Sequence, residues 1–158
     1  MSDTSDTYEA DILLWSEHQS ELLRRLARGE PGNETPDWDN IIEEVESVGR
    51  SQLSAVRSLL IRALEHMLKA QAWPLSQAVP GWKVEARRFR FEAAEAFTPS
   101  MRQRIDLAKL YRQAMKLLPE TMDGQPPLPV PPECPFTLDA LLAEEDSDPV
   151  FARKPGAG

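Results

Sequence analysis

One long segment, from Pro36 to Trp73, constrains the fold more than any other part of the chain. Thr35 is a residue type that caps helices, and Pro36 suits the first helical position. Apolar residues then recur at steps of three and four, which is typical of one helix face. The members of this stripe are Trp38, Ile41, Ile42, Val45, Val48, Leu53, Val56, Leu59, Leu60, Ala63, Met67 and Ala70.

The stripe stays in register over its whole length, which predicts a single helix of ~37 residues, or ~55 Å at 1.5 Å per residue. Gly49 is its one weak point, because glycine costs ~1 kcal/mol in a helix interior. Pro74 ends the helix, since the residue before a proline is disfavoured in the helical region. Trp38 and Val45 lie in the middle of the stripe, so we expect both in the core.

The remaining segments predict shorter helices and no strand. Helices are expected over residues 7–28 and 82–97, after Thr98-Pro99 as far as Leu118, and in a short segment that Thr137 caps. The proline-rich residues 126–135 predict an extended strap. The sequence therefore predicts an all-α bundle of four main helices, one very long, plus a short C-terminal helix and the strap. We expect one helical domain over 7–145, between disordered residues 1–6 and 146–158.

Composition narrows the function classes. The net charge of −8 argues against a general nucleic-acid binder, which usually presents a basic face. No long apolar run predicts a membrane span, and the polar, acidic N-terminus is unlike a signal peptide. A lone cysteine, Cys134, excludes an internal disulfide and favours a cytoplasmic location, with the thiol buried or inert.

Several motifs together resemble the bacterial domain of unknown function 29 family, from about Tyr8 to Leu142. They are Tyr8-Glu9-Ala10-Asp11 with Trp15, Asp37-Trp38 leading into Ile42-Glu43-Glu44-Val45-Glu46-Ser47-Val48-Gly49-Arg50, Leu64-Glu65-His66-Met67-Leu68-Lys69, Trp82, and Glu133-Cys134-Pro135-Phe136-Thr137-Leu138. The resemblance implies an all-helical, mostly bacterial, cytoplasmic protein and implies no activity. The family often has an aromatic residue just after Lys69, where this chain has Ala70-Gln71-Ala72-Trp73.

A polar face runs beside the apolar stripe. Asp39, Glu43, Glu46 and Arg50 follow steps of four, three and four, so they share one side of the helix. The simplest interpretation is a solvated face in which Glu46 and Arg50 form an ion pair. The alternatives are a carboxylate cluster for metal or acid–base chemistry, and a polar contact to another helix.

His66 is the histidine that such a cluster would need, but a straight helix places it ~30 Å beyond Glu46. The two side chains could meet only if the chain folds back near Gly49, or across a dimer. We therefore expect a half-buried structural His66, bonded to a backbone carbonyl or a carboxylate, and we assign no metal and no cofactor.

A basic set interrupted by glutamates lies further along the chain. It consists of Lys83, Arg87, Arg88, Arg90, Arg102 and Arg104, with Glu85, Glu92 and Glu95 between them. We expect these basic residues to form salt bridges with the glutamates on the protein surface. The alternative is that they give this region a local affinity for anions or nucleic acid.

The function most consistent with these features is a helical interaction or adaptor module that self-associates, as a dimer, with room for a further protein partner. A helix of ~55 Å exceeds the ~30 Å diameter of a small domain, so part of its stripe needs another cover. The alternatives are an enzyme that uses Glu43 and Glu46, with a metal or as acid and base, and a regulator associated with nucleic acid.

Overall fold

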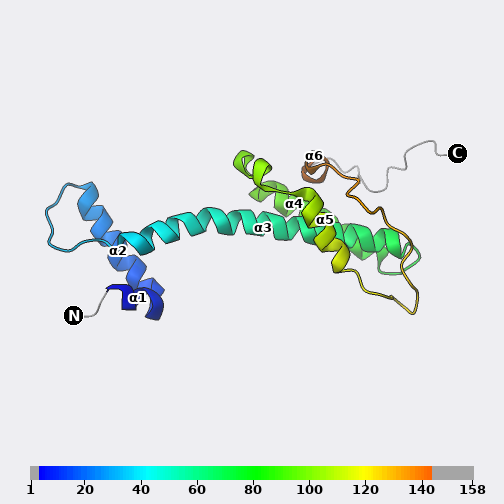
Figure 1. Ribbon diagram of the computed structural model, residues 1–158, viewed down its shortest axis with the longest axis horizontal. Helices are drawn as coiled ribbons and strands as arrows, with labels where there is room; N and C mark the ends of the chain where they lie inside the picture. Colours follow the sequence, from blue (N-terminus) through cyan, green and yellow to red (C-terminus); the bar gives the residue numbers. More distant parts are fainter. Residues whose placement is uncertain (1–3, 144–158) are drawn as a thin grey trace. The chain divides into compact units, whose positions relative to one another are not determined.

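The computed structural model describes residues 4–143, and over that range the chain is helical, with no strand (Figure 1). The predicted all-α class is thereby confirmed. The chain forms two compact units that divide between Ser51 and Gln52. The predicted disorder of residues 146–158 lies outside the described residues, whereas residues 4–6 belong to the first helix.

The first unit contains α1 (Thr4–Ala10), α2 (Ile12–Ala27) and the beginning of α3 (Trp38–Ala72). The sequence predicted one helix over 7–28, but Asp11 divides it. Asp11 has a φ of −152°, and its Oδ1 accepts a hydrogen bond from the Leu14 backbone N–H at 3.0 Å. An aspartate that binds the backbone in this way caps a new helix instead of continuing the old one.

The long helix α3 covers 35 residues and is continuous through Gly49, as the apolar stripe predicted. It begins at Trp38, later than the proposed cap at Thr35. The Asp37 carbonyl accepts the hydrogen bond from Ile41 N–H at 2.9 Å, so Asp37 takes the place of the expected cap.

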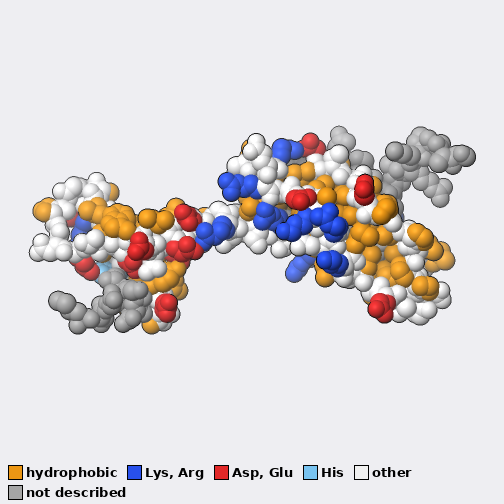
Figure 2. All heavy atoms as spheres, in the orientation of Figure 1, with side chains coloured by type: hydrophobic (Ala, Val, Ile, Leu, Met, Phe, Trp, Pro, Cys, Tyr) orange, Lys and Arg blue, Asp and Glu red, His pale blue; other side chains and the backbone are white. Residues whose placement is uncertain are grey.

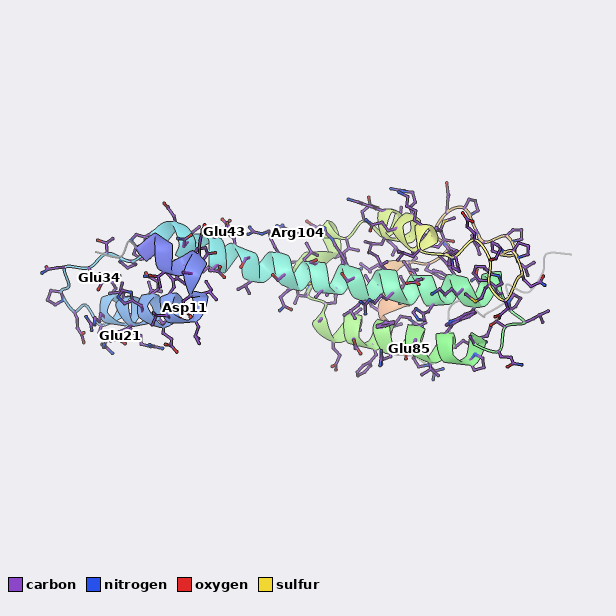
Figure 3. All side chains as sticks on the ribbon, turned by 90° about the horizontal axis from the view of Figure 1, so that it is seen from below. Asp11, Glu21, Glu34, Glu43, Glu85 and Arg104 are labelled. Atoms are coloured by element: carbon purple, nitrogen blue, oxygen red, sulfur yellow. The ribbon has the colours of Figure 1, made fainter. Side chains whose placement is uncertain are left out.

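In the second unit, α3 lies between α4 (Val79–Ala96) and α5 (Leu107–Lys116) (Figures 1 and 3). The predicted fourth helix is divided into a 3₁₀ turn over Pro99–Arg104 and α5. Asp106 makes the division, since its side chain caps α5 by accepting from the Lys109 N–H. The core that these helices enclose consists of Val56, Leu60, Leu64, Met67, Leu68, Ala86, Ala93, Met101, Leu110, Tyr111, Ala114 and Leu141.

The predicted strap is present and is tied to the helices by hydrogen bonds. The Leu128 N–H donates to the Ala72 carbonyl at 2.9 Å, and Trp73 Nε1 donates to the Gln125 carbonyl at 3.0 Å. The buried Tyr111 hydroxyl donates to the Pro131 carbonyl at 2.7 Å. The strap leads into the short α6 (Leu138–Leu142), which Thr137 caps as predicted.

The predicted burial of Trp38 and Val45 is wrong. Trp38 is 46% exposed and Val45 is 69% exposed, although Val56, Leu60 and Ala63 on the same stripe are fully buried. The periodicity of apolar residues identifies the apolar face of a helix, but it does not show how far along the helix other elements cover that face. In the first unit, α3 uses a different side, roughly a third of a turn away, where Asp37 and Glu44 bind residues of α1 and α2.

The tie between Tyr111 and the strap leads to a first prediction. Tyr111→Phe should lower the free energy of unfolding by about 1 kcal/mol at neutral pH, because the Pro131 carbonyl loses its donor. Burial raises the pKa of Tyr111 from 10.0 to about 12, with a smaller contribution from Cys134. The contribution of this hydroxyl to stability is therefore complete below pH 10 and is lost as the pH rises through 12.

Urea unfolding of the wild type and of Tyr111→Phe across this alkaline range measures both effects. The difference between the two proteins should shrink as the pH rises. A difference that stays constant across the range would contradict the assignment.

Candidate functional site

A polar junction centred on Asp37 joins α2 to the beginning of α3. Trp15 Nε1 donates to Asp37 Oδ2 at 3.0 Å, and Asn40 Nδ2 donates to the same oxygen at 2.8 Å. The Asp37 backbone N–H donates to Gln19 Oε1 at 2.8 Å. The hydrogen bond from Asn40, helped by the one from Trp15, lowers the pKa of the Asp37 carboxyl despite the opposing effect of desolvation.

Tyr8 adds a second bond between α1 and α3. Its hydroxyl donates to Glu44 Oε1 at 2.6 Å, and this bond raises the pKa of Tyr8. Its ring meets the Trp15 ring edge to face, with 4.8 Å between the ring centroids. Because these polar atoms are committed to one another, we interpret the junction as structural.

Sequence reasoning missed this junction. Tyr8, Trp15 and Asp37 belong to the motifs that resemble a family, and no contact between them was predicted. The contact could have been anticipated, because a buried tyrosine or tryptophan needs a hydrogen-bond partner for its O–H or N–H group. Asp37 is an acceptor close to the start of the helix that Tyr8 and Trp15 would pack against.

The predicted cluster on α3 is only partly assembled. Arg50 contacts Glu43 through Nη2 at 2.5 Å and Glu46 through Nη1 at 3.5 Å. All three side chains are more than half exposed, and Asp39 is exposed on the same side. An exposed ion-pair group of this kind contributes little to stability, and it matches the interpretation as a solvated face.

His66 is not part of that group. Its Nδ1 lies 2.9 Å from the Arg62 carbonyl oxygen, so this nitrogen must carry the proton. Its ring also contacts Phe89, with centroids 5.6 Å apart. The half-buried, carbonyl-bonded histidine is what the sequence predicted. Gly49 lies inside the helix Trp38–Ala72. Across residues 4–143, no group of three or more His, Cys, Asp or Glu side chains is placed to hold a metal ion.

The predicted basic set is largely engaged in contacts within the second unit. Arg88 pairs with Glu85 at 2.8 Å, and Arg102 pairs with Asp139 at 2.8 Å. Arg90 is buried, and it donates to the Ala140 and Leu141 carbonyls of α6. Arg90 and Arg102 thus fasten α4 and the 3₁₀ turn to α6, while Arg88 forms a surface ion pair within α4, as the interpretation as a salt-bridged surface expected.

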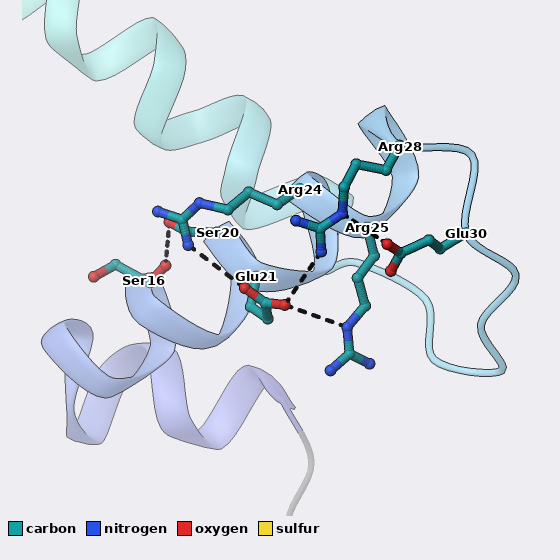
Figure 4. A network of polar contacts seen from close by, with 7 residues as sticks. All are labelled: Ser16, Ser20, Glu21, Arg24, Arg25, Arg28 and Glu30. Carbon is teal, nitrogen blue, oxygen red and sulfur yellow. Dashed lines mark hydrogen bonds and ion pairs between the residues drawn. The ribbon is translucent and has the colours of Figure 1, made fainter.

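Charge is divided unequally between the units. Residues 4–51 contain twelve acidic and four basic side chains, whereas residues 52–143 contain nine acidic and twelve basic ones. Acidic residues of the first unit include Asp11, Glu21, Glu34 and Glu43 (Figure 3). Of its basic residues, Arg24, Arg25 and Arg28 contact Glu21 (Figure 4). Lys and Arg side chains form a visible band over the second unit (Figure 2).

The largest anomaly in the first unit is its uncovered apolar surface. Four apolar side chains of α3, which we call the exposed face, are accessible to water: Trp38 (46%), Ile42 (53%), Val45 (69%) and Val48 (64%). Gly49 is on the same side by helical projection, and a Cβ added there would meet no atom within 4 Å. Hydrophobic side chains reach the surface over α2 and the first turns of α3 (Figure 2). Contiguous apolar surface of this kind marks interaction sites.

The second unit has a small apolar pocket of about 240 Å³ where α3 ends. Trp73, Leu75, Met122 and Leu128 are among its lining residues. Its volume is below the usual range for small-molecule sites, and the described lining contains few polar groups that would orient a ligand. Separately, none of the helices in the described part has the length and apolar character needed to cross a membrane.

Comparison with known proteins agrees with this architecture. The model of the family described as "Domain of unknown function DUF29" matches residues 7–146. The chain belongs to this family. The crystal structure of an alpha-helical protein of unknown function from Rhodospirillum rubrum is similar, with a TM-score of 0.59 and 26% identity over 88% of this chain and 90% of that chain. The search among curated proteins found no match.

The junction supports a second prediction. Asp37→Asn should weaken the packing of α2 on α3 by about 1 kcal/mol, because its hydrogen bonds no longer involve a charged acceptor. The pKa of Asp37 is lower in the folded protein than its ordinary value of 3.8. The charged carboxylate therefore stabilises the folded protein above that pH, and this stabilisation is lost as the pH falls through the lowered pKa.

Amide hydrogen exchange in α2 reports this local stability. Exchange should be faster in Asp37→Asn at neutral pH and should converge with wild type in acid. Asp39→Asn, two residues further on and exposed, is the matched control and should leave α2 unchanged. Equal protection in all three proteins would refute the role of Asp37.

A third prediction concerns metal. Glu43 and Glu46 are held by Arg50, and His66 Nδ1 is engaged by the Arg62 carbonyl, so we expect neither glutamate to bind a transition metal tightly. Elemental analysis of the purified protein tests this. A stoichiometric metal that disappears in Glu46→Ala would contradict it and would favour a carboxylate enzyme.

Proposed function

We propose that the protein is a helical interaction module that self-associates through the exposed face of α3. The observation that carries the proposal is the uncovered row of Trp38, Ile42 and Val45, on a helix whose same stripe is buried further along. A cytoplasmic location, which the lone Cys134 favours, belongs to the same proposal.

The first unit has little core of its own. Among its described side chains, the buried ones are the apolar Trp15, Leu22 and Pro36 and the polar Gln19. Gln19 Nε2 is buried and has no hydrogen-bond partner within the described part of the chain. Units of this size rarely enclose enough apolar surface to be stable without help, so a second molecule against the exposed face would compensate.

The energy available from covering the exposed face is sufficient for a modest interaction. Each of the four half-exposed side chains leaves on the order of 100 Å² in water, or ~2.5 kcal/mol at ~25 cal/mol per Å², so together they can supply up to roughly 10 kcal/mol per molecule. When two molecules cover one another, this hydrophobic free energy doubles. The translational and rotational freedom lost on association offsets ~4–15 kcal/mol of it. A dimer of micromolar affinity is the expected order of magnitude.

A second copy of the chain is the partner that these features favour. A two-fold arrangement lets one exposed face cover its equivalent on the other copy. A different protein that binds the same face would make the module an adaptor. The carboxylate enzyme and the nucleic-acid regulator gain no comparable support, since Glu43 and Glu46 are bound by Arg50, and Arg88, Arg90 and Arg102 hold groups of their own unit.

A fourth prediction tests self-association directly. Sedimentation over a concentration series should show the wild type passing from 17.8 kDa to twice that mass by high micromolar protein. Val45→Asp should remain a monomer, because it places a charge in the contact. Its melting temperature at low concentration should stay close to wild type, because Val45 is exposed in the single chain.

Val84→Asp is the matched control, because Val84 is on α4 and has a similar exposure of 62%. It should dimerise like the wild type. A wild type that stays at 17.8 kDa at every concentration would refute self-association. Equal weakening by both aspartate variants would show that association does not use the exposed face.

A further inference from the structure

We infer that two copies pair antiparallel along the first turns of α3, with Trp38 of each copy packed over Gly49 of the other. The inference rests on the proposed self-association and adds its direction and register. It follows from the order of side-chain sizes along the exposed side of the helix.

The spacing of the contact residues is symmetric. Trp38, Ile42, Val45 and Gly49 are separated by steps of four, three and four, which read the same from either end. A two-fold axis across the helix therefore places Trp38 opposite Gly49 and Ile42 opposite Val45. No shift of register is needed to superimpose the two rows.

The sizes of the opposed side chains are complementary in this arrangement. Trp38 is the largest side chain in the row and is 46% exposed, whereas Gly49 leaves open space with no atom within 4 Å of a built Cβ. Each indole would fill the space over a glycine, and the two aliphatic pairs would fill the centre. A parallel pair would instead place tryptophan against tryptophan and leave a void between the two glycines, about 16 Å along the helix.

Charged residues flank the row. The antiparallel arrangement brings Asp39 of one copy near Arg50 of the other, and it places Glu43 opposite Glu46. Arg50 pairs with both glutamates within its own chain, so the direction follows from the sizes of the opposed side chains.

The buried area is consistent with a modest but specific dimer. Trp38, Ile42 and Val45 each contribute on the order of 100 Å², so the two copies bury roughly 600 Å² at the centre of the contact. Val48 and the polar residues on either side bring this toward the ~1,200 Å² at the low end of stable interfaces.

Gly49→Ala separates stability from association, because the two should change in opposite directions. The added methyl meets nothing in the single chain, and alanine is the better helix former by ~1 kcal/mol, so the melting temperature of the monomer should rise. The dimer should weaken, because the methyl occupies the space that the indole needs. Gly49→Leu should weaken it more, by about tenfold or greater in dissociation constant.

The exchange Trp38→Gly/Gly49→Trp provides the decisive comparison. Each single change should weaken the dimer, and the double exchange should restore it, because every tryptophan again faces a glycine. A double exchange no better than the two single changes would overturn the register.

Disulfide trapping tests the direction. In a Cys134→Ser background, Trp38→Cys and Gly49→Cys chains are mixed and oxidised. The proposal expects the mixed product, with little of either homodimer. Homodimers linked 38 to 38 and 49 to 49 would overturn the antiparallel arrangement yet leave self-association intact, whereas a wild type that sediments as a monomer would refute both.

Discussion

The carboxylate of Asp37 is the group on which the arrangement of the first unit depends. It accepts hydrogen bonds from Trp15 and Asn40, while its own N–H donates to Gln19. One residue therefore determines where α3 begins and which side of it α2 covers. Hydrogen bonds to a charged acceptor are stronger than neutral ones, so this contact can orient a unit that has few buried apolar side chains.

The exposed face is a consequence of that orientation. Because α1 and α2 bind α3 through Asp37 and Glu44, the side that carries Ile42 and Val45 is left to the solvent. In the second unit, the same stripe is enclosed by the core, to which α4, α5 and α6 contribute residues. A single helix thus has one apolar pattern with two different surroundings. The pattern alone is insufficient to distinguish a residue that is buried within the chain from one available to another molecule.

The sequence predicted the parts of the fold that local chemistry controls. The continuity of α3, the strap and the cap at Thr137 depend on helical period, proline and a single side chain, and all are observed. The break at Asp11 was missed because an aspartate within an apolar period resembles an ordinary surface position until its carboxylate is seen to bind the Leu14 N–H. The network around Asp37 was missed because it joins residues 22 and 18 positions apart, which no local pattern reveals.

Gly49 offers the clearest reason to look beyond the single chain. A glycine in a helix interior costs ~1 kcal/mol relative to alanine. Within residues 4–143 nothing offsets this cost, because Gly49 is helical and a Cβ there would meet no neighbouring atom of the described chain. The helix is continuous there, so no turn between helices requires a glycine at this position. Gly49 lies in the same row as Trp38, Ile42 and Val45. In the proposed dimer, the indole of the second copy occupies the space that a side chain at Gly49 would fill.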